Sequence, residues 1–174
     1  VLDTRFNAPD AEIILRSSDN IDFAVHKSIL QFVAPVFSDM LSLPPAADTL
    51  SEERPVVEME EDSDSLRLLL SFSYPRGFIP EPALSNLADI KRSALMARKY
   101  DIEFMRDKAE RALIDSSIPP AVAYAVSWRF EYSIALRKAA RRTLEQPNLF
   151  RSLADSPEFS EVSAVAFIRL WHYH

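Results

Sequence analysis

Histidine is the residue type in this chain that could bind a metal or titrate near neutral pH, and there are three. His172 and His174 stand two positions apart, whereas two metal ligands on one helix face need a spacing of about three or four. His26 stands alone between a predicted strand and a predicted helix. The chain has no cysteine, which excludes thiolate metal sites, disulfides and cysteine nucleophiles. We therefore expect no metal and no other cofactor.

Carboxylate side chains gather in one stretch, where they could act as acid–base catalysts or as calcium ligands. The stretch contains Glu58, Glu60, Glu61, Asp62 and Asp64. Catalytic carboxylates need a cleft that gives them different environments, and an EF-hand loop needs a central glycine that is missing here. The pattern instead indicates a solvated strand edge that leads into a helix N-terminus, where acids interact favourably with the helix dipole.

Serine could act as a nucleophile, but no serine stands in the Gly-x-Ser-x-Gly turn that exposes it in hydrolases. Gly77 is the only glycine, whereas a phosphate-binding loop needs several. The sequence therefore contains no recognisable set of catalytic residues. An uncharacterised helical enzyme is the alternative from a different functional class, and no residue pattern supports it.

The net charge of −6 is concentrated in one acidic segment. Residues 48–64 contain eight acids and one base, so the remaining residues sum to about +1. Proteins that bind nucleic acid normally present a basic surface, because contacts to phosphate dominate their affinity. No apolar run approaches the roughly 18 residues that a membrane-spanning helix needs. We expect neither nucleic acid nor a membrane as a partner.

Four basic residues form a stripe on a predicted C-terminal helix: Arg137, Lys138, Arg141 and Arg142. Acidic residues flank the stripe on both sides, which is typical of a solvated helix face. The alternative is a contact for an acidic partner, and the sequence leaves both interpretations open.

The spacing of apolar residues predicts a mixed α and β organisation. Alternating residues predict a β-hairpin over 12–25, with Asn20 at positive φ in its turn, and a third strand over 56–60. Helical spacing predicts two short helices over 27–41 that meet near Pro35, because proline disfavours helical geometry in the residue before it. Further helices are predicted at 62–74, 83–100, 104–114 and, beyond residue 119, at three places up to residue 171.

Segments that follow one another along the chain resemble the BTB/POZ family. They are residues 23–30 (FAVHKSIL), 34–41 (APVFSDML), 56–59 (VVEM), 69–74 (LLSFSY) with Gly77 and Phe78, and 95–102 (LMARKYDI). The resemblance implies an α/β (α+β), mainly helical fold, in which helical hairpins flank a small three-stranded sheet and a C-terminal helical extension follows. The whole chain, which ends in AFIRLWHYH, is also similar to a large group of fungal BTB proteins with such an extension.

The resemblance also implies how the chain is divided and what it does. We expect an N-terminal segment at 1–9, a BTB/POZ domain at 10–115 and a helical extension at 116–174. The implied function is protein–protein interaction inside the cell, as a homodimerising scaffold or adaptor rather than an enzyme.

The apolar first helix supplies the expected dimer interface, because a two-fold partner presents the same apolar face in return. Its candidate residues are Ile29, Phe32, Val33 and Val36. Part of this helix also packs inside the monomer, and the sequence does not apportion the two roles.

The resemblance implies roles for three polar residues. Glu12 and Lys27 match positions at which dimeric BTB domains bring an acid and a base together near the subunit boundary. His26 matches a packed position whose imidazole links the strand to the helix.

A second function implied by the resemblance is that of a substrate adaptor for a cullin-RING ubiquitin ligase. BTB proteins that recruit such a ligase often carry an apolar–x–Glu tripeptide in this loop, and residues 50–52 match it. The candidate cullin contacts are Met40, Leu50 and Glu52.

Overall fold

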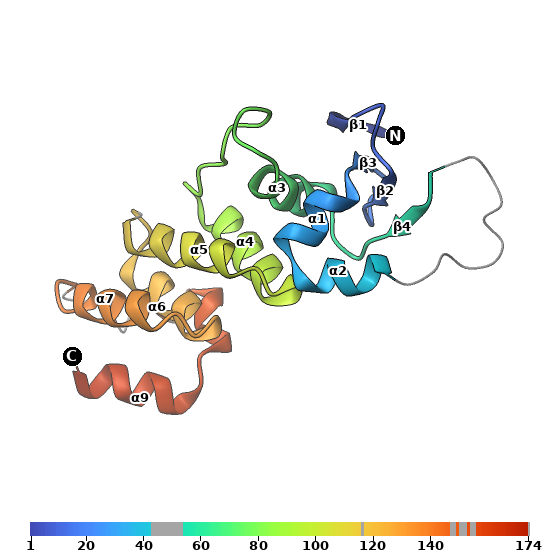
Figure 1. Cartoon of the computed structure of the whole chain (residues 1–174). Helices are drawn as coiled ribbons and strands as arrows, with labels where there is room; N and C mark the ends of the chain where they lie inside the picture. The colour runs from blue at the N-terminus through green and yellow to red at the C-terminus, as the bar shows by residue number, and fades with distance from the viewer. Residues whose placement is uncertain (43–53, 116, 147–148, 150–152, 154–155, 174) are drawn as a thin grey trace. The chain divides into compact units, whose positions relative to one another are not determined.

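The computed structural model describes residues 1–42, 54–115, 117–146, 149, 153 and 156–173 (Figure 1). The chain divides into two units, each with its own apolar core. The first unit comprises Val1–Ala83 and Leu95–Met105, and the second comprises Leu84–Ala94 and Arg106–His174. The described elements are mainly helices with one small sheet, which confirms the predicted fold class.

Among the described residues, four short strands form the sheet of the first unit, in the order β1-β3-β2-β4. The strands β2 (Ile13–Arg16) and β3 (Asp22–Val25) pair antiparallel. Asn20, in the turn between them, has φ of 63°, as the hairpin requires in the absence of a glycine. The strand β4 (Val56–Glu58) lies parallel to β2. The predicted hairpin and third strand are therefore confirmed.

The strand β1 (Leu2–Asn7) was not predicted, so the sheet has one strand more than the sequence analysis expected. It pairs parallel with β3, and its register shifts between Leu2 and Asn7. The shift breaks the regular alternation of inward and outward side chains, which is the pattern that identifies a strand in a sequence.

A buried carboxylate attaches β1 to the helix α3 (Ser63–Ser73). The Asp3 side chain is 3% exposed and accepts hydrogen bonds from the backbone N–H groups of Arg5 and Phe6, at 2.8 and 3.1 Å. It also accepts one from Nε of Arg67 in α3, at 2.8 Å. These bonds compensate for the cost of removing the charge from water.

The helices α1 (Lys27–Val33) and α2 (Pro35–Ser42) meet at Ala34. Ala34 has extended backbone, with φ of −137° and ψ of 121°, which is the conformation that a following proline favours. The predicted break between two short helices is therefore confirmed. The core beneath them contains Phe6, Ile13, Leu15, Phe23, Val25, Leu30, Phe37, Leu66, Leu69, Leu70, Met96, Tyr100, Ile102 and Met105.

The helices α4 (Leu87–Tyr100) and α5 (Glu103–Asp115) follow as predicted. Asp101 between them has φ of 54°, and the N–H of Ile102 donates to the carbonyl of Ala97 at 2.9 Å. A residue with positive φ directly after a helix is a common way to end it.

The second unit continues with α6 (Pro120–Arg129), α7 (Ser133–Thr143), the 3-10 helix η1 (Pro157–Glu161) and α9 (Ala164–Tyr173). Pro120 begins α6, a position that proline tolerates well because its missing N–H would be unbonded there anyway. Among the described helices, none combines the length and the apolar character needed to cross a bilayer. The core of this unit includes Ile90, Ala109, Leu113, Tyr124, Val126, Phe130, Tyr132, Ala135, Ala139, Leu149, Leu153 and Leu170.

A hydrogen-bonded junction joins the end of β3 to the end of α3 in the first unit. The hydroxyl oxygen of Tyr74 accepts a hydrogen bond from the backbone N–H of His26 at 3.0 Å and lies 3.0 Å from Nδ1 of the same residue. The other ring nitrogen, Nε2, lies 3.4 Å from Oδ1 of Asp10. One half-buried phenol therefore serves two polar groups of His26.

We expect Tyr74→Phe to lower the free energy of unfolding by about 1–3 kcal/mol, because it leaves the N–H of His26 without its acceptor. Urea titration measures the change. The matched control is Tyr173→Phe, at a side chain that is 53% exposed, and this variant should unfold like the wild type. Identical midpoints for all three proteins would show that the junction contributes nothing to stability.

Asp3 links the stability of the first unit to pH. Burial alone raises its pKa, but hydrogen bonds from Arg67 and from the N–H groups of Arg5 and Phe6 outweigh burial, so the pKa lies below the ordinary 3.8. A carboxylate with a lowered pKa stabilises the fold above its unfolded-state pKa and loses that contribution as the pH falls through its folded-state pKa. We expect Asp3→Asn to be destabilised at neutral pH and to approach the wild type below about pH 4.

Urea titrations of both proteins at a series of pH values measure this convergence. Asp107→Asn on α5 is the control, since Asp107 is exposed, and it should follow the wild type at every pH. A difference between Asp3→Asn and the wild type that stays constant down to the lowest pH would contradict the prediction.

Candidate protein-interaction surface

The two-turn helix α1 has a buried inner side. Leu30 is 1% exposed and Ala34, directly after the helix, is fully buried, and both belong to the core of the first unit. Val33 is half-buried and packs against the same core. These contacts fix which side of the helix faces away from the core.

The outer side of α1 leaves apolar side chains in solvent. Phe32 is 92% exposed, and Val36 at the start of α2 is 38% exposed. Ile29 is half-buried. The structure thus apportions the four predicted interface residues: Phe32 and Val36 are free to meet another chain, while Ile29 and Val33 are partly covered within the monomer.

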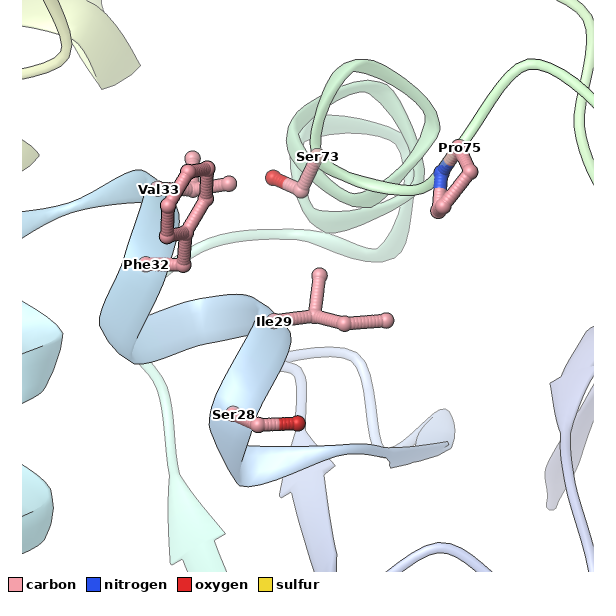
Figure 2. Close-up of a pocket in the computed structure, with 6 residues that line it drawn as sticks. All are labelled: Ser28, Ile29, Phe32, Val33, Ser73 and Pro75. Carbon is pink, nitrogen blue, oxygen red and sulfur yellow. The ribbon is translucent and has the colours of Figure 1, made fainter.

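A groove of about 380 Å³ lies beside Phe32, between α1 and the end of α3 (Figure 2). Ile29 extends from α1 into the space that Ser73 and Pro75 border (Figure 2). The Ser73 hydroxyl already donates to the carbonyl of Leu69 at 2.8 Å, so the groove offers mainly apolar surface. The residues that line it are Ser28, Ile29, Phe32, Val33, Ser73 and Pro75.

Glu12 and Lys27, the predicted acid and base, meet through the backbone. Oε2 of Glu12 accepts a hydrogen bond at 3.1 Å from the N–H of Lys27, the first residue of α1. His26 makes no capping bond with its side chain, so Glu12 satisfies one of the free N–H groups at the start of the helix. In the described part of the chain, no ion pair joins the two side chains. Their place at a subunit boundary stays a prediction.

The acidic stretch before α3 is engaged within the first unit. Glu60 and Glu61 contact Nζ of Lys99 at 2.8 and 2.5 Å, and the hydroxyl of Tyr100 donates to Glu61 at 2.8 Å. Lys99 lowers the pKa of Glu60, while burial and the nearby Glu61 raise the pKa of Tyr100. Within the described residues, no three histidines or acids are grouped so as to hold a metal ion. These carboxylates connect the segment before α3 to α4.

Of the three candidate cullin contacts, one lies among the described residues. Met40 is half-buried and packs against the core of the first unit. Leu50 and Glu52 lie outside the described residues. The cullin contact therefore stays a prediction of the sequence.

Sequence reasoning missed the far wall of the groove. Ser73 and Pro75 come from the end of α3, about 40 residues after α1, and their residue types carry no interaction signal of their own. Ser28 was missed as well, although it lies next to the predicted Ile29. Only the folded arrangement of α1 and α3 makes these residues neighbours.

Comparison with known families gives one match. The model of the BTB/POZ domain matches residues 5–117, a span that contains β2 to β4, α1 to α5 and every residue that lines the groove. No curated protein matches the chain. BTB/POZ domains are non-enzymatic protein–protein interaction modules. With more than half of its length matched, the chain belongs to the BTB/POZ family.

Proposed function

We propose that this BTB/POZ protein forms a homodimer through the outer side of α1. The observation that carries the proposal is Phe32, an aromatic side chain that is 92% exposed beside an apolar groove. A two-fold axis near α1 lets the Phe32 of each subunit enter the groove of the other, so one surface serves as both ligand and receptor.

The energy of such a contact decides how large the interface must be. Burying one phenylalanine contributes about 2–3 kcal/mol, and two-fold symmetry doubles this. Association of two proteins costs roughly 4–15 kcal/mol in lost freedom. The free energy gained by burying the two Phe32 rings matches only the lower end of that cost. Ile29 and Val36 must therefore be buried as well. The proposed interface therefore has Phe32 at its centre and these two residues beside it.

We expect Phe32→Gln to weaken self-association at least about 30-fold, because a central aromatic side chain at an interface is worth about 2 kcal/mol or more. Analytical ultracentrifugation measures the dissociation constant. Phe78→Gln is the matched control, since Phe78 is 81% exposed in the same unit but does not line the groove. A monomeric wild type, or a Phe32 variant that dimerises like the Phe78 variant, would refute the proposal.

The apolar character of the surface predicts that self-association depends little on ionic strength. The dissociation constant should change less than roughly threefold between about 0.05 and 0.5 M salt. The same ultracentrifugation experiment at both salt concentrations tests this. A weakening of tenfold or more at high salt would indicate that charged groups such as Glu12 and Lys27 carry the interface instead.

The finer expectations from the resemblance belong to the same proposal. We infer a scaffold or adaptor that works inside the cell and is similar to fungal BTB proteins with a helical extension. Its proposed division is 1–9, 10–115 and 116–174. Recruitment of a cullin stays a prediction of the sequence, because no contact among the described residues favours it.

A further inference from the structure

The helix α7 presents an outer face that combines positive charge with exposed apolar groups. Arg137, Lys138 and Arg141 are exposed, and they lie between Ile134 and Leu144, which are 49% and 46% exposed. Their spacing places all five on one side of the helix. The opposite side supplies Ala135, Ala139 and Thr143 to the buried interior of the second unit.

The three cations on this face have no acidic partner among the described residues. Other basic residues of the same unit do: Nζ of Lys91 lies 3.4 Å from Glu158, and the guanidinium of Arg129 lies 2.7 Å from Glu161. Arg142, at the edge of the face, donates instead to the carbonyl of Ile118 at 3.0 Å. The positive charge of the α7 face is thus left uncompensated by the described residues of its own unit.

The carboxylate of Glu110 contacts α7 but does not pair with these cations. Glu110 accepts hydrogen bonds from the N–H groups of Ile134 and Ala135, at 2.8 and 3.1 Å. It therefore satisfies the start of α7 rather than pairing with the cations. The second unit as a whole has twelve Lys and Arg against nine Asp and Glu, whereas the first has eight against seventeen.

The length of this face indicates what kind of partner it can bind. Ile134 and Leu144 are ten residues apart, which is about 15 Å along the helix axis. A partner helix of the same length can place an apolar residue against each end and acidic residues against the middle. Free phosphate chains also carry negative charge, but they supply no apolar contact for Ile134 and Leu144.

We propose that the outer face of α7 docks an acidic amphipathic helix of another protein. Ile134 and Leu144 contact apolar residues at the two ends of that helix, and Arg137, Lys138 and Arg141 pair with carboxylates between them. This surface belongs to the second unit, whereas the groove beside Phe32 belongs to the first.

The test uses a fluorescent, end-capped helical peptide of about 18 residues with two leucines ten positions apart and three glutamates between them. A second peptide has glutamine in place of each glutamate. Fluorescence anisotropy with the full chain at low salt should show binding of the acidic peptide, at least about tenfold tighter than the glutamine peptide, since three exposed ion pairs are lost.

Variants of the chain locate the site. Combined Arg137→Gln, Lys138→Gln and Arg141→Gln should weaken binding about tenfold. Ile134→Ser with Leu144→Ser should weaken it too. The matched control changes net charge equally at Arg98, Arg106 and Arg111, which are exposed on α4 and α5, and should bind like the wild type. Phe32→Gln should also bind normally, which separates this surface from the dimer interface.

Four results would overturn the proposal: no binding of the acidic peptide, equal binding of both peptides, equal loss in the control variant, or an α7 variant that binds like the wild type. Binding to phosphatidylserine vesicles but not to the peptide would assign the face to lipid. Self-association that the α7 variant abolishes without any peptide would assign it to a second copy of the chain.

Discussion

The packing of Leu30 and Ala34 into the core of the first unit determines what the rest of α1 can do. The helix has only seven residues, so anchoring one side with these two leaves little freedom in how it turns. Pro35 ends it by holding Ala34 in an extended conformation, and Phe37 restarts the inward packing in α2. Phe32 is then held in solvent by the same contacts that stabilise the monomer. Its exposure is built into the fold, and burial against another chain is the direct way to recover its hydrophobic free energy.

Polar capping strengthens this arrangement without adding to the core. Glu12 bonds the first N–H of α1 from the strand side, and Tyr74 bonds the N–H and ring of His26 from the end of α3. The two walls of the groove, α1 and the end of α3, are thereby both held at the short connection between β3 and α1. The groove depends on this connection, because Pro75 follows Tyr74 directly and Ile29 lies in the first turn of α1.

Much of this fold could be predicted from periodicity, and the strand that could not shows why. The hairpin, the break at Pro35 and the helices from α3 to α7 follow ordinary apolar spacing. In β1 the buried residues are Asp3 and Phe6, three positions apart, and one of them is charged. A period of two would have placed them differently. Burial of the Asp3 charge depends on two local backbone N–H groups and on the guanidinium of Arg67, which is 64 residues away. Local patterns contain no trace of such a distant partner.

Only part of the candidate surface could be named from the sequence: four residues around α1 were predicted, but the far wall of the groove at Ser73 and Pro75 was not. The role of the charged residues was hidden in the same way. Spacing identified Ile29, Phe32, Val33 and Val36, yet it could not show that Val33 faces the core while Phe32 faces solvent. The acidic stretch is the largest charge feature of the sequence, but Glu58 pairs with Arg16, Glu60 and Glu61 with Lys99, and Asp64 with Arg67.

Those acids are therefore engaged inside the first unit, whereas Arg137, Lys138 and Arg141 on α7 have no acidic partner among the described residues. For recognition, the charge that matters is the charge left uncompensated after folding. A small set of unpaired cations between two exposed apolar residues can attract a partner more specifically than a larger cluster of carboxylates already bonded to their own chain. By that criterion the largest charge feature of the sequence joins parts of the first unit, and the proposed docking surface comes from a smaller one.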